Sequence, residues 1–324
     1  MAAPNEPLVS VVTPVHNGEA YLAECIESVL RQTYSNWEYV IVDNCSTDRT
    51  GEIARNYAQQ DARIRVHATD TFLPLLANWN HALRQISPTS KYCKVVHADD
   101  WLFPECLHQM VALAEMNPSV GIIGAYRLEQ DHVSLDGLPY PSTIVSGWDI
   151  CRRHLLDGAH IFGSPTSLLI RADLARQREA FYNEDNLHSD VEVCLELLRF
   201  VDFGFVHQVL TFTRRHNESM TSFCQRLNTY VPSWLYMLQK HGKYYMSETE
   251  YQEAMREKLR SYYRFLGSSL LRLRKPEFSA RRREFWDYHT KALTDLGHPI
   301  NHARLAGAAL IALYNSLLYK LHIR

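Results

Sequence analysis

The sequence lacks most features that mark secreted, zinc-binding or nucleic-acid-binding proteins. Its seven cysteines are scattered, odd in number and form no Cys-x-x-Cys pair, which argues against a disulfide framework or a zinc site. The net charge of −2 gives no reason to expect a nucleic-acid partner. The N-terminal segment has neither a basic start nor an apolar core, so we expect no secretory signal and a cytoplasmic protein.

Two common phosphate-binding loops are also absent. The apolar run at residues 8–13 predicts a first buried strand, but neither Gly-x-Gly-x-x-Gly nor Gly-Lys-Ser/Thr follows it. The sequence at 13–19 is instead Thr-Pro-Val-His-Asn-Gly-Glu. This rigid loop cannot wrap a diphosphate with bare backbone, so a phosphorylated ligand would have to be held in another way.

Apolar runs and helical patterns alternate through about the first 125 residues, with buried strands predicted at 8–13, 39–42, 64–68, 94–96 and 120–126. This alternation predicts an α/β fold with a parallel sheet and crossover helices. The 46% hydrophobic residues suffice for a core.

The most informative segment is 94–101, Lys-Val-Val-His-Ala-Asp-Asp-Trp. A buried strand here ends abruptly in Asp99 and Asp100, at the carboxyl edge where open α/β sheets bind ligands. Adjacent carboxylates repel each other unless a cation lies between them, and hard divalent cations take oxygen ligands. The segment therefore indicates a divalent cation that carries a phosphorylated ligand. The alternative is an Asp pair that caps the next helix.

The second half is less regular. Residues 127–165 form a polar region interrupted by Gly and Pro, and a short strand is expected at 166–170. A strong helix follows at 190–200, and a further strand at 203–212.

Five motifs resemble family 2 glycosyltransferases of the GT-A fold, in order and at the usual spacing. They are residues 9–19, 27–34, 42–48, Asn-Trp-Asn at 78–80, and His-Ala-Asp-Asp at 97–100. The resemblance covers about the first 220 residues. It implies a GT-A fold, with a mixed, mostly parallel sheet flanked by helices and a helical C-terminal extension.

The resemblance also implies a site for the nucleotide-diphosphate sugar. Asp43 would accept a hydrogen bond from a uracil, thymine or guanine N–H, which favours a UDP-, GDP- or dTDP-linked donor. The alternative is an Asp that only shapes its loop. The loop after the first strand would wall the base and ribose, and the remaining residues expected to bind the donor lie further along. The full set is Thr13, Pro14, Val15, His16, Asn17, Glu19, Asp43, Asn78, Asp99, Arg214 and Arg215.

The metal site implied by the resemblance would bind Mn²⁺ or Mg²⁺ through Asp100 and Asp99. His97 stands where the common family form has a first acid. In the loop 214–220, His216 is expected to add a third metal ligand, and Arg214 or Arg215 to neutralise the leaving diphosphate. The alternative is a basic loop that is only solvated.

The resemblance assigns the catalytic base to Asp190, in Leu-His-Ser-Asp-Val-Glu at 187–192. An inverting transfer needs a carboxylate that takes the proton of the acceptor hydroxyl. Ser189 replaces the Glu that usually precedes this acid. The alternative is that Asp190 only caps its helix, with Glu192 and Glu184-Asp185 as nearby substitutes.

The C-terminal part matches no motif of the family. We expect a catalytic domain at 1–224 and a helical region at 225–324. The apolar run 305–321 falls short of a span of about 20 residues. Two interpretations stay open: a helix packed on the catalytic domain or on a second subunit, or a membrane-surface helix that brings the enzyme to the inner face of the cell membrane.

The sequence thus predicts an inverting, metal-dependent glycosyltransferase, a hexosyl- or related transferase. The Gln-x-x-Arg-Trp signature of processive members is absent, so we expect one sugar to be added per encounter. The acceptor would be a glycan or a lipid-linked molecule in polysaccharide, O-antigen or glycolipid assembly. The main alternative is a catalytically inactive protein of the same fold that binds a sugar nucleotide or a glycan. A nucleotidyltransferase would usually show a Gly-rich, basic loop after the first strand, which this chain lacks.

Overall fold

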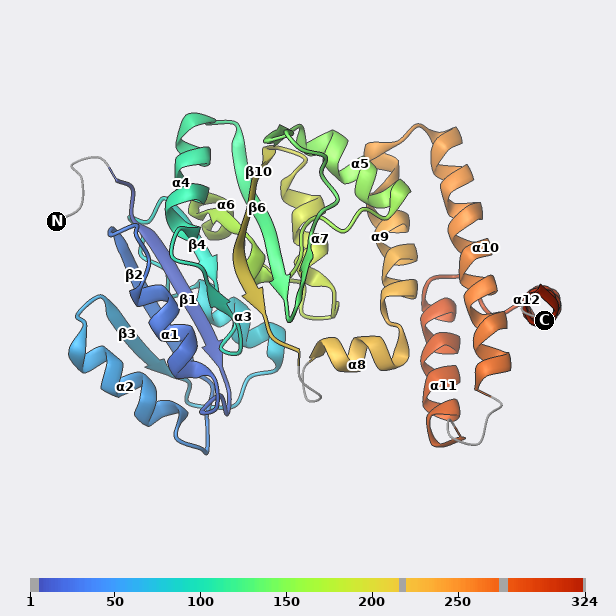
Figure 1. Cartoon of the computed structure of the whole chain (residues 1–324), viewed down its shortest axis with the longest axis horizontal. Helices are drawn as coiled ribbons and strands as arrows, with labels where there is room; N and C mark the ends of the chain where they lie inside the picture. The colour runs from blue at the N-terminus through green and yellow to red at the C-terminus, as the bar shows by residue number, and fades with distance from the viewer. Residues whose placement is uncertain (1–5, 216–219, 274–278, 323–324) are drawn as a thin grey trace. The chain divides into compact units, whose positions relative to one another are not determined.

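The computed structural model describes residues 6–215, 220–273 and 279–322. The chain forms two compact units, Met1–Arg215 and His216–Arg324 (Figure 1). The domain boundary that we expected at residue 224 stays a prediction.

The first unit is built around one sheet with the strand order β3-β2-β1-β4-β9-β6-β10-β5; β7 pairs with β6 and β8 with β10. Its strands are β1 (Val9–Val15), β2 (Trp37–Asp43), β3 (Ile64–Ala68), β4 (Tyr92–Val95), β5 (Trp101–Leu102), β6 (Val120–Glu129), β7 (His132–Ser134), β8 (Ile144–Val145), β9 (Leu169–Arg171) and β10 (Asp202–Thr213). Strands β3, β2, β1 and β4 are parallel neighbours, whereas β9 runs antiparallel between β4 and β6. The expected mixed, mostly parallel sheet is confirmed.

The helices of this unit are α1 (Leu22–Leu30), α2 (Thr50–Gln60), α3 (Leu75–Leu83), α4 (Cys106–Met116), α5 (Gly147–Asp157), α6 (Ala172–Arg176) and α7 (Ser189–Leu197), with a 3₁₀ turn η1 (Pro165–Ser167). The apolar faces of α1 and α4 join the main core with one face of the sheet. Helix α3 packs against β1 and β2, where Val12, Val40 and Val42 point to the other face. Helices on both faces explain why these strands are apolar throughout.

The segment expected to be irregular between 127 and 165 contains β7, β8 and α5. Helix α5 begins at Ser146, whose Oγ accepts a hydrogen bond from the Asp149 N–H, and it ends at Gly158 in the left-handed conformation. The strand expected at 166–170 begins later, because its first half forms η1.

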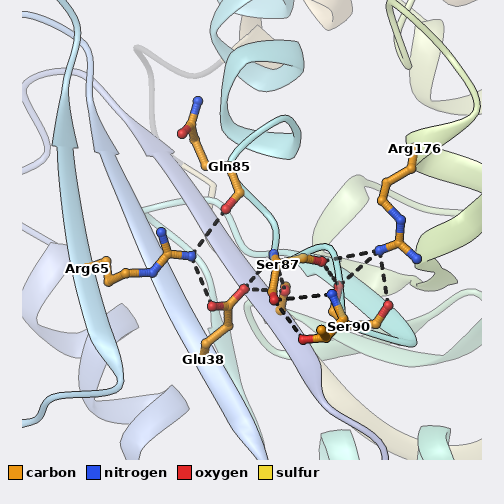
Figure 2. Close-up of polar contacts among 8 residues, drawn as sticks. Glu38, Arg65, Gln85, Ser87, Ser90 and Arg176 are labelled. Carbon is orange, nitrogen blue, oxygen red and sulfur yellow. Dashed lines mark hydrogen bonds and ion pairs between the residues drawn. The ribbon is translucent and has the colours of Figure 1, made fainter.

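A polar network fixes the loop between α3 and β4 (Figure 2). The Glu38 carboxylate accepts hydrogen bonds from the Ser87 N–H at 2.7 Å and from Arg65 at 2.9 Å. Arg176 donates to the carbonyls of Ser87 and Ser90. Because this network lies at the start of β2, it anchors the loop at the edge opposite the carboxyl ends of the strands.

Asn80 ties α3 to the segment that leads into α7. Its side-chain Nδ2 donates to the Tyr182 carbonyl at 2.8 Å, and its Oδ1 accepts from the Tyr182 N–H at 2.7 Å. Nδ2 also donates to the Glu184 carboxylate. One buried amide therefore satisfies both backbone groups of a residue that follows it by 102 positions.

The second unit contains helices α8 (Met220–Leu227), α9 (Tyr230–Tyr245), α10 (Glu248–Arg272), α11 (Ser279–Asp295) and α12 (His302–His322). A capping box between Ser247 and Glu250 starts α10. Gly267 of α10 lies against the backbone of α12: an added Cβ would come within 2.6 Å of the Ala308 carbonyl carbon. In the described part of the chain, every helix is too short or too polar to cross a membrane.

We predict that Asn80→Ala destabilises the protein by about 2–4 kcal/mol, because the Tyr182 N–H and carbonyl would lose their partner in a buried position. Urea unfolding of the full chain measures this change. The exposed Asn56→Ala on α2 is the matched control and should have little effect. Equal stability of the two variants would contradict a role for the Asn80 amide as an anchor.

Candidate active site

The carboxyl ends of β1, β2, β4 and β10 face the same edge of the sheet, because these strands run in the same direction. The loops that leave them carry most of the residues that the sequence singled out. Several hydrogen bonds join neighbouring loops of this edge.

Asp100 is buried beside Asp99 at the end of β4. Its carboxylate accepts a hydrogen bond from the Arg214 backbone N–H at 3.1 Å, and the Thr166 hydroxyl also contacts it. Burial, and then the charge of Asp99, raise the pKa of the Asp100 carboxyl to about 7. Burial and the neighbouring charge disfavour the ionised form of this carboxyl, and a bound cation would stabilise that form.

His97 lies next to the two carboxylates. Its Nδ1 is 4.0 Å from Asp100 Oδ2, and ligand atoms of His97, Asp99 and Asp100 all lie within 4.8 Å of one another. Burial lowers the pKa of the imidazole. The ring packs on Trp79, with centroids 4.6 Å apart. One nitrogen and two carboxylate oxygens together are a donor set that fits a divalent cation.

The turn η1 contacts this cluster through Thr166. Thr166 is fully buried, and its Oγ accepts a hydrogen bond from the His97 N–H at 3.1 Å. The buried Lys94 ammonium donates to the carbonyls of Thr166 and Leu168 at 2.8 and 3.2 Å. Lys94 was not identified as a site residue from the sequence, although a lysine inside an apolar strand was the available signal.

Several residues that the sequence assigns to the nucleotide site make contacts within the protein. Thr13 is fully buried and its hydroxyl donates to the Val96 carbonyl, and Pro14 and Val15 are also buried in β1. The Asn17 side chain accepts from the Thr47 N–H. Glu19 accepts from the Arg49 N–H. Asn17 and Glu19 thus join the loops after β1 and β2.

Asp43 ends β2, and its Oδ1 accepts from the Ser46 N–H. The following Asn44 was missed by sequence reasoning. Its side-chain amide pairs with both the N–H and the carbonyl of Leu73, at 2.8 Å each. This pairing holds the neighbouring Phe72, which is 60% exposed, edge-on to the His16 ring at 4.9 Å. Two rings and a carboxylate therefore lie around the end of β2.

Asn78 is buried in α3, and its Oδ1 has no hydrogen-bond partner within the described residues. Asp190 lies in the first turn of α7 and accepts from the Val191 N–H. Burial raises the pKa of the Asp190 carboxyl to about 6, against the opposing effects of this bond and of Arg127. Glu192 is buried and accepts from the side chains of Asn183 and Asn186, so its carboxylate is engaged within the protein.

Arg127 is a further residue that sequence reasoning missed. Its charge lowers the pKa of both Asp100 and Asp190, so the guanidinium acts on both carboxylates. It pairs with the buried Glu129, which also pairs with Arg215. The segment 127–165 carries no motif, and the sequence around Arg127 and Glu129 gives no local signal for this pair.

Arg214 braces the acidic turn. Its Nε donates to the Asp99 carbonyl, and its guanidinium pairs with Glu24 and lies over the Tyr21 ring. Both arginines expected near a diphosphate are thus engaged with acidic residues. His216, the expected third metal ligand, lies outside the described residues.

A sheet with this topology and an acidic cluster at its carboxyl edge are typical of nucleotide-sugar transferases of the GT-A type. The family model described as Glycosyl transferase family 2 matches residues 10–178. EpsE of Bacillus subtilis, named as a glycosyltransferase, is 35% identical over 243 residues, which cover 71% of this chain and 87% of EpsE. GlyG of Streptococcus pneumoniae, another named glycosyltransferase, is 31% identical over 148 residues, or 46% of this chain and 47% of GlyG. The chain belongs to glycosyltransferase family 2, and it is a glycosyltransferase.

Solved structures agree on the fold. Residues 1–349 of TarS from Staphylococcus aureus, in complex with UDP-GlcNAc, match with a TM-score of 0.64 at 18% identity, covering 89% of this chain and 80% of that one. The mannosyltransferase PcManGT from Pyrobaculum calidifontis, in complex with GDP-Man and Mn²⁺, matches with a TM-score of 0.55 at 13% identity, covering 96% and 88%.

Proposed function

We propose that the protein transfers one sugar from a nucleotide-diphosphate sugar to an acceptor hydroxyl with inversion, with the help of a divalent cation. The observation that carries this proposal is the cluster of His97, Asp99 and Asp100. The charge of Arg127 acts to lower the pKa of Asp100 in this cluster and also the pKa of Asp190. A cation site and a carboxylate with a raised pKa are the two groups that such a transfer requires.

The donor nucleotide would lie at the ends of β1 and β2. Asp43 would accept the base N–H, and the rings of His16 and Phe72 would flank the base. Thr13, Pro14 and Val15 would form the floor from within β1, while Asn17 and Glu19 would keep the two loops together. The complexes of TarS with UDP-GlcNAc and of PcManGT with GDP-Man support a nucleotide-sugar donor.

Asp99 and Asp100 would hold Mn²⁺ or Mg²⁺, whose charge would offset that of the leaving diphosphate. The position of Asp100 fits this role, because burial and then the Asp99 charge raise the pKa of its carboxyl, and a bound cation would offset both effects. Arg214 would keep the acidic turn in place and, with Arg215, face the phosphates. Asn78, with its unpartnered buried oxygen, would lie on the sugar side of the site.

Asp190 would act as the base. Its carboxylate would take the proton of the acceptor hydroxyl as the oxygen attacks the anomeric carbon from the side opposite the nucleotide. The Asp190 charge also contributes to the raised pKa of Tyr182, whose ring contacts Trp79, and Trp79 packs on His97. This chain of contacts supports a position of Asp190 on the same side as the metal cluster.

We predict that Asp190→Asn lowers turnover by about 10²- to 10⁴-fold, because the amide cannot accept the proton. In the wild type, kcat should rise with pH and level off above about 6, as the Asp190 carboxyl ionises. Release of nucleoside diphosphate from UDP-, GDP- and dTDP-sugars, with Mn²⁺ and an acceptor glycan, measures both effects. Glu179→Gln, at an exposed acid between α6 and α7, is the control.

The folded state of Asp190→Asn can be verified independently. The raised pKa means that ionisation of Asp190 removes stability as pH rises from about 4 to about 6. The Asn variant avoids this loss, so it should be at least as stable as the wild type at pH 8. Turnover that survives in a folded Asp190→Asn would contradict the base assignment. A wild type that binds nucleotide but never transfers sugar would support the inactive binding protein instead.

We further propose that the second unit makes peripheral contact with an anionic membrane, where a lipid-linked acceptor would be found. Residues 216–324 contain 17 Lys and Arg against 9 Asp and Glu, a net charge of +8. Residues 1–215 contain 17 against 27, a net charge of −10. Such an excess of positive charge in one unit favours an anionic lipid surface.

Helix α12 supplies an apolar surface in the same unit. Its buried side, around Ala308, packs on Gly267 of α10. The exposed large apolar side chains on the helix are Leu310, Ile311, Leu313, Tyr314, Leu317 and Leu318. An apolar face on a helix that is too short or polar to span the bilayer is suited to lie in the lipid interface.

The wild type should float with vesicles that contain phosphatidylglycerol, less so with pure phosphatidylcholine, and binding should weaken at high salt. We predict that the double variant Leu310→Glu, Leu317→Glu lowers vesicle affinity at least tenfold, because it charges the exposed face of α12. Phe200→Glu, at an 80% exposed apolar residue of the first unit, is the control. The alternative is that a second copy of the chain covers this face of α12. Light scattering tests it: if the wild type forms an oligomer, binds no vesicles and is dissociated by the double substitution, the face is an interface between copies.

A further inference from the structure

We propose that the His97 imidazole is a third protein ligand of the cation, so that the site prefers Mn²⁺ or Co²⁺ to Mg²⁺. This inference rests on the metal site of the proposed function. The common family form has an acid at this position, so a histidine here changes both the charge and the chemical hardness of the donor set. The consequence concerns which cation the protein selects.

The distances support direct ligation. Two ligands of one ion, each about 2.1 Å from it, lie about 3–4 Å apart. The 4.0 Å between His97 Nδ1 and Asp100 Oδ2 is at the outer end of this range, and Asp99 offers an oxygen within the same 4.8 Å cluster. Small rotations of the three side chains would bring all three donors onto one ion.

The ring is also held in place. Trp79 packs on one face of the imidazole, with planes 33° apart. The backbone N–H of His97 donates a hydrogen bond to the Thr166 hydroxyl, and the Lys94 ammonium donates to the Thr166 carbonyl. Among the described residues, the buried Nε2 has no hydrogen-bond partner. Packing on Trp79 thus orients the ring, and its Nδ1 is the nitrogen that lies near the Asp100 carboxylate, where a shared cation would be bound.

Chemistry then determines the preferred cation. A neutral imidazole in place of a carboxylate reduces the negative charge of the site by one. Mg²⁺ favours oxygen ligands and keeps much of its water, whereas imidazole suits first-row transition ions. Co²⁺ and Mn²⁺ should therefore displace Mg²⁺ from this site. The competing possibility is that His97 only forms an ion pair with Asp100 and never touches the cation.

Pulsed electron paramagnetic resonance of Mn²⁺ bound to the full chain distinguishes these possibilities, because only a directly bound imidazole gives a strong ¹⁴N coupling. Mn²⁺ is titrated alone and with UDP or GDP, and Mg²⁺ is then added as a competitor. We expect a ¹⁴N coupling in the wild type and in His108→Ala, an exposed histidine on α4. His97→Ala should lose the coupling and bind Mn²⁺ at least tenfold more weakly.

His97→Asp restores a carboxylate and serves as the second variant. It should bind Mn²⁺ without ¹⁴N coupling and lose much of the discrimination against Mg²⁺, while its thermal unfolding shows that it is folded. Mn²⁺ bound to the wild type without coupling, or no Mn²⁺ binding under any of these conditions, would overturn the proposal. The proposed function has a separate readout: if Asp100→Ala abolishes Mn²⁺ binding while His97→Ala does not, the metal site stands and only the role of His97 fails.

Discussion

The repulsion between Asp99 and Asp100, one of them buried, is the constraint on which the rest of the site depends. Both acids lie in a turn at the end of β4, where water cannot fully solvate them. The protein surrounds this turn with donors from distant segments: the Arg214 N–H at the end of β10 and the Thr166 hydroxyl of η1. The antiparallel strand β9 is what brings η1 to this position. The mixed topology of the sheet is therefore tied to the acidic turn.

The parallel half of the fold could be predicted from the sequence because its strands are long, apolar and separated by regular helical patterns. The insertion of β9 and the helix α5 could not, since they are short and depend on contacts far away in the chain. Ser146, three residues before Asp149, is a local helix-capping signal for the start of α5. The pairing of Arg127 with Glu129 and Arg215 had no local signal, because a charged residue in a strand reads as solvent-facing until the fold covers it.

The motif at 9–19 shows what a resemblance can and cannot indicate. It located the edge of the sheet where the candidate site lies. It did not indicate which of its side chains hold the neighbouring loop and which do not, because both kinds occupy the same few positions. Asn17 and Glu19 hold the neighbouring loop, whereas His16 is exposed beside Phe72, a residue outside every motif. Only the three-dimensional arrangement distinguishes these roles.

Lys94 has a consequence for the order in which the chain folds. Its ammonium is buried in β4, and the carbonyls that accept its hydrogen bonds come from residues 72 and 74 positions later. A nascent chain that ends before Thr166 would have to bury this charge without those acceptors, which is strongly unfavourable. The surroundings of Lys94 are therefore complete only when η1 and the residues that lead into β9 are in place. This contact makes the packing of β4 depend on the middle of the chain.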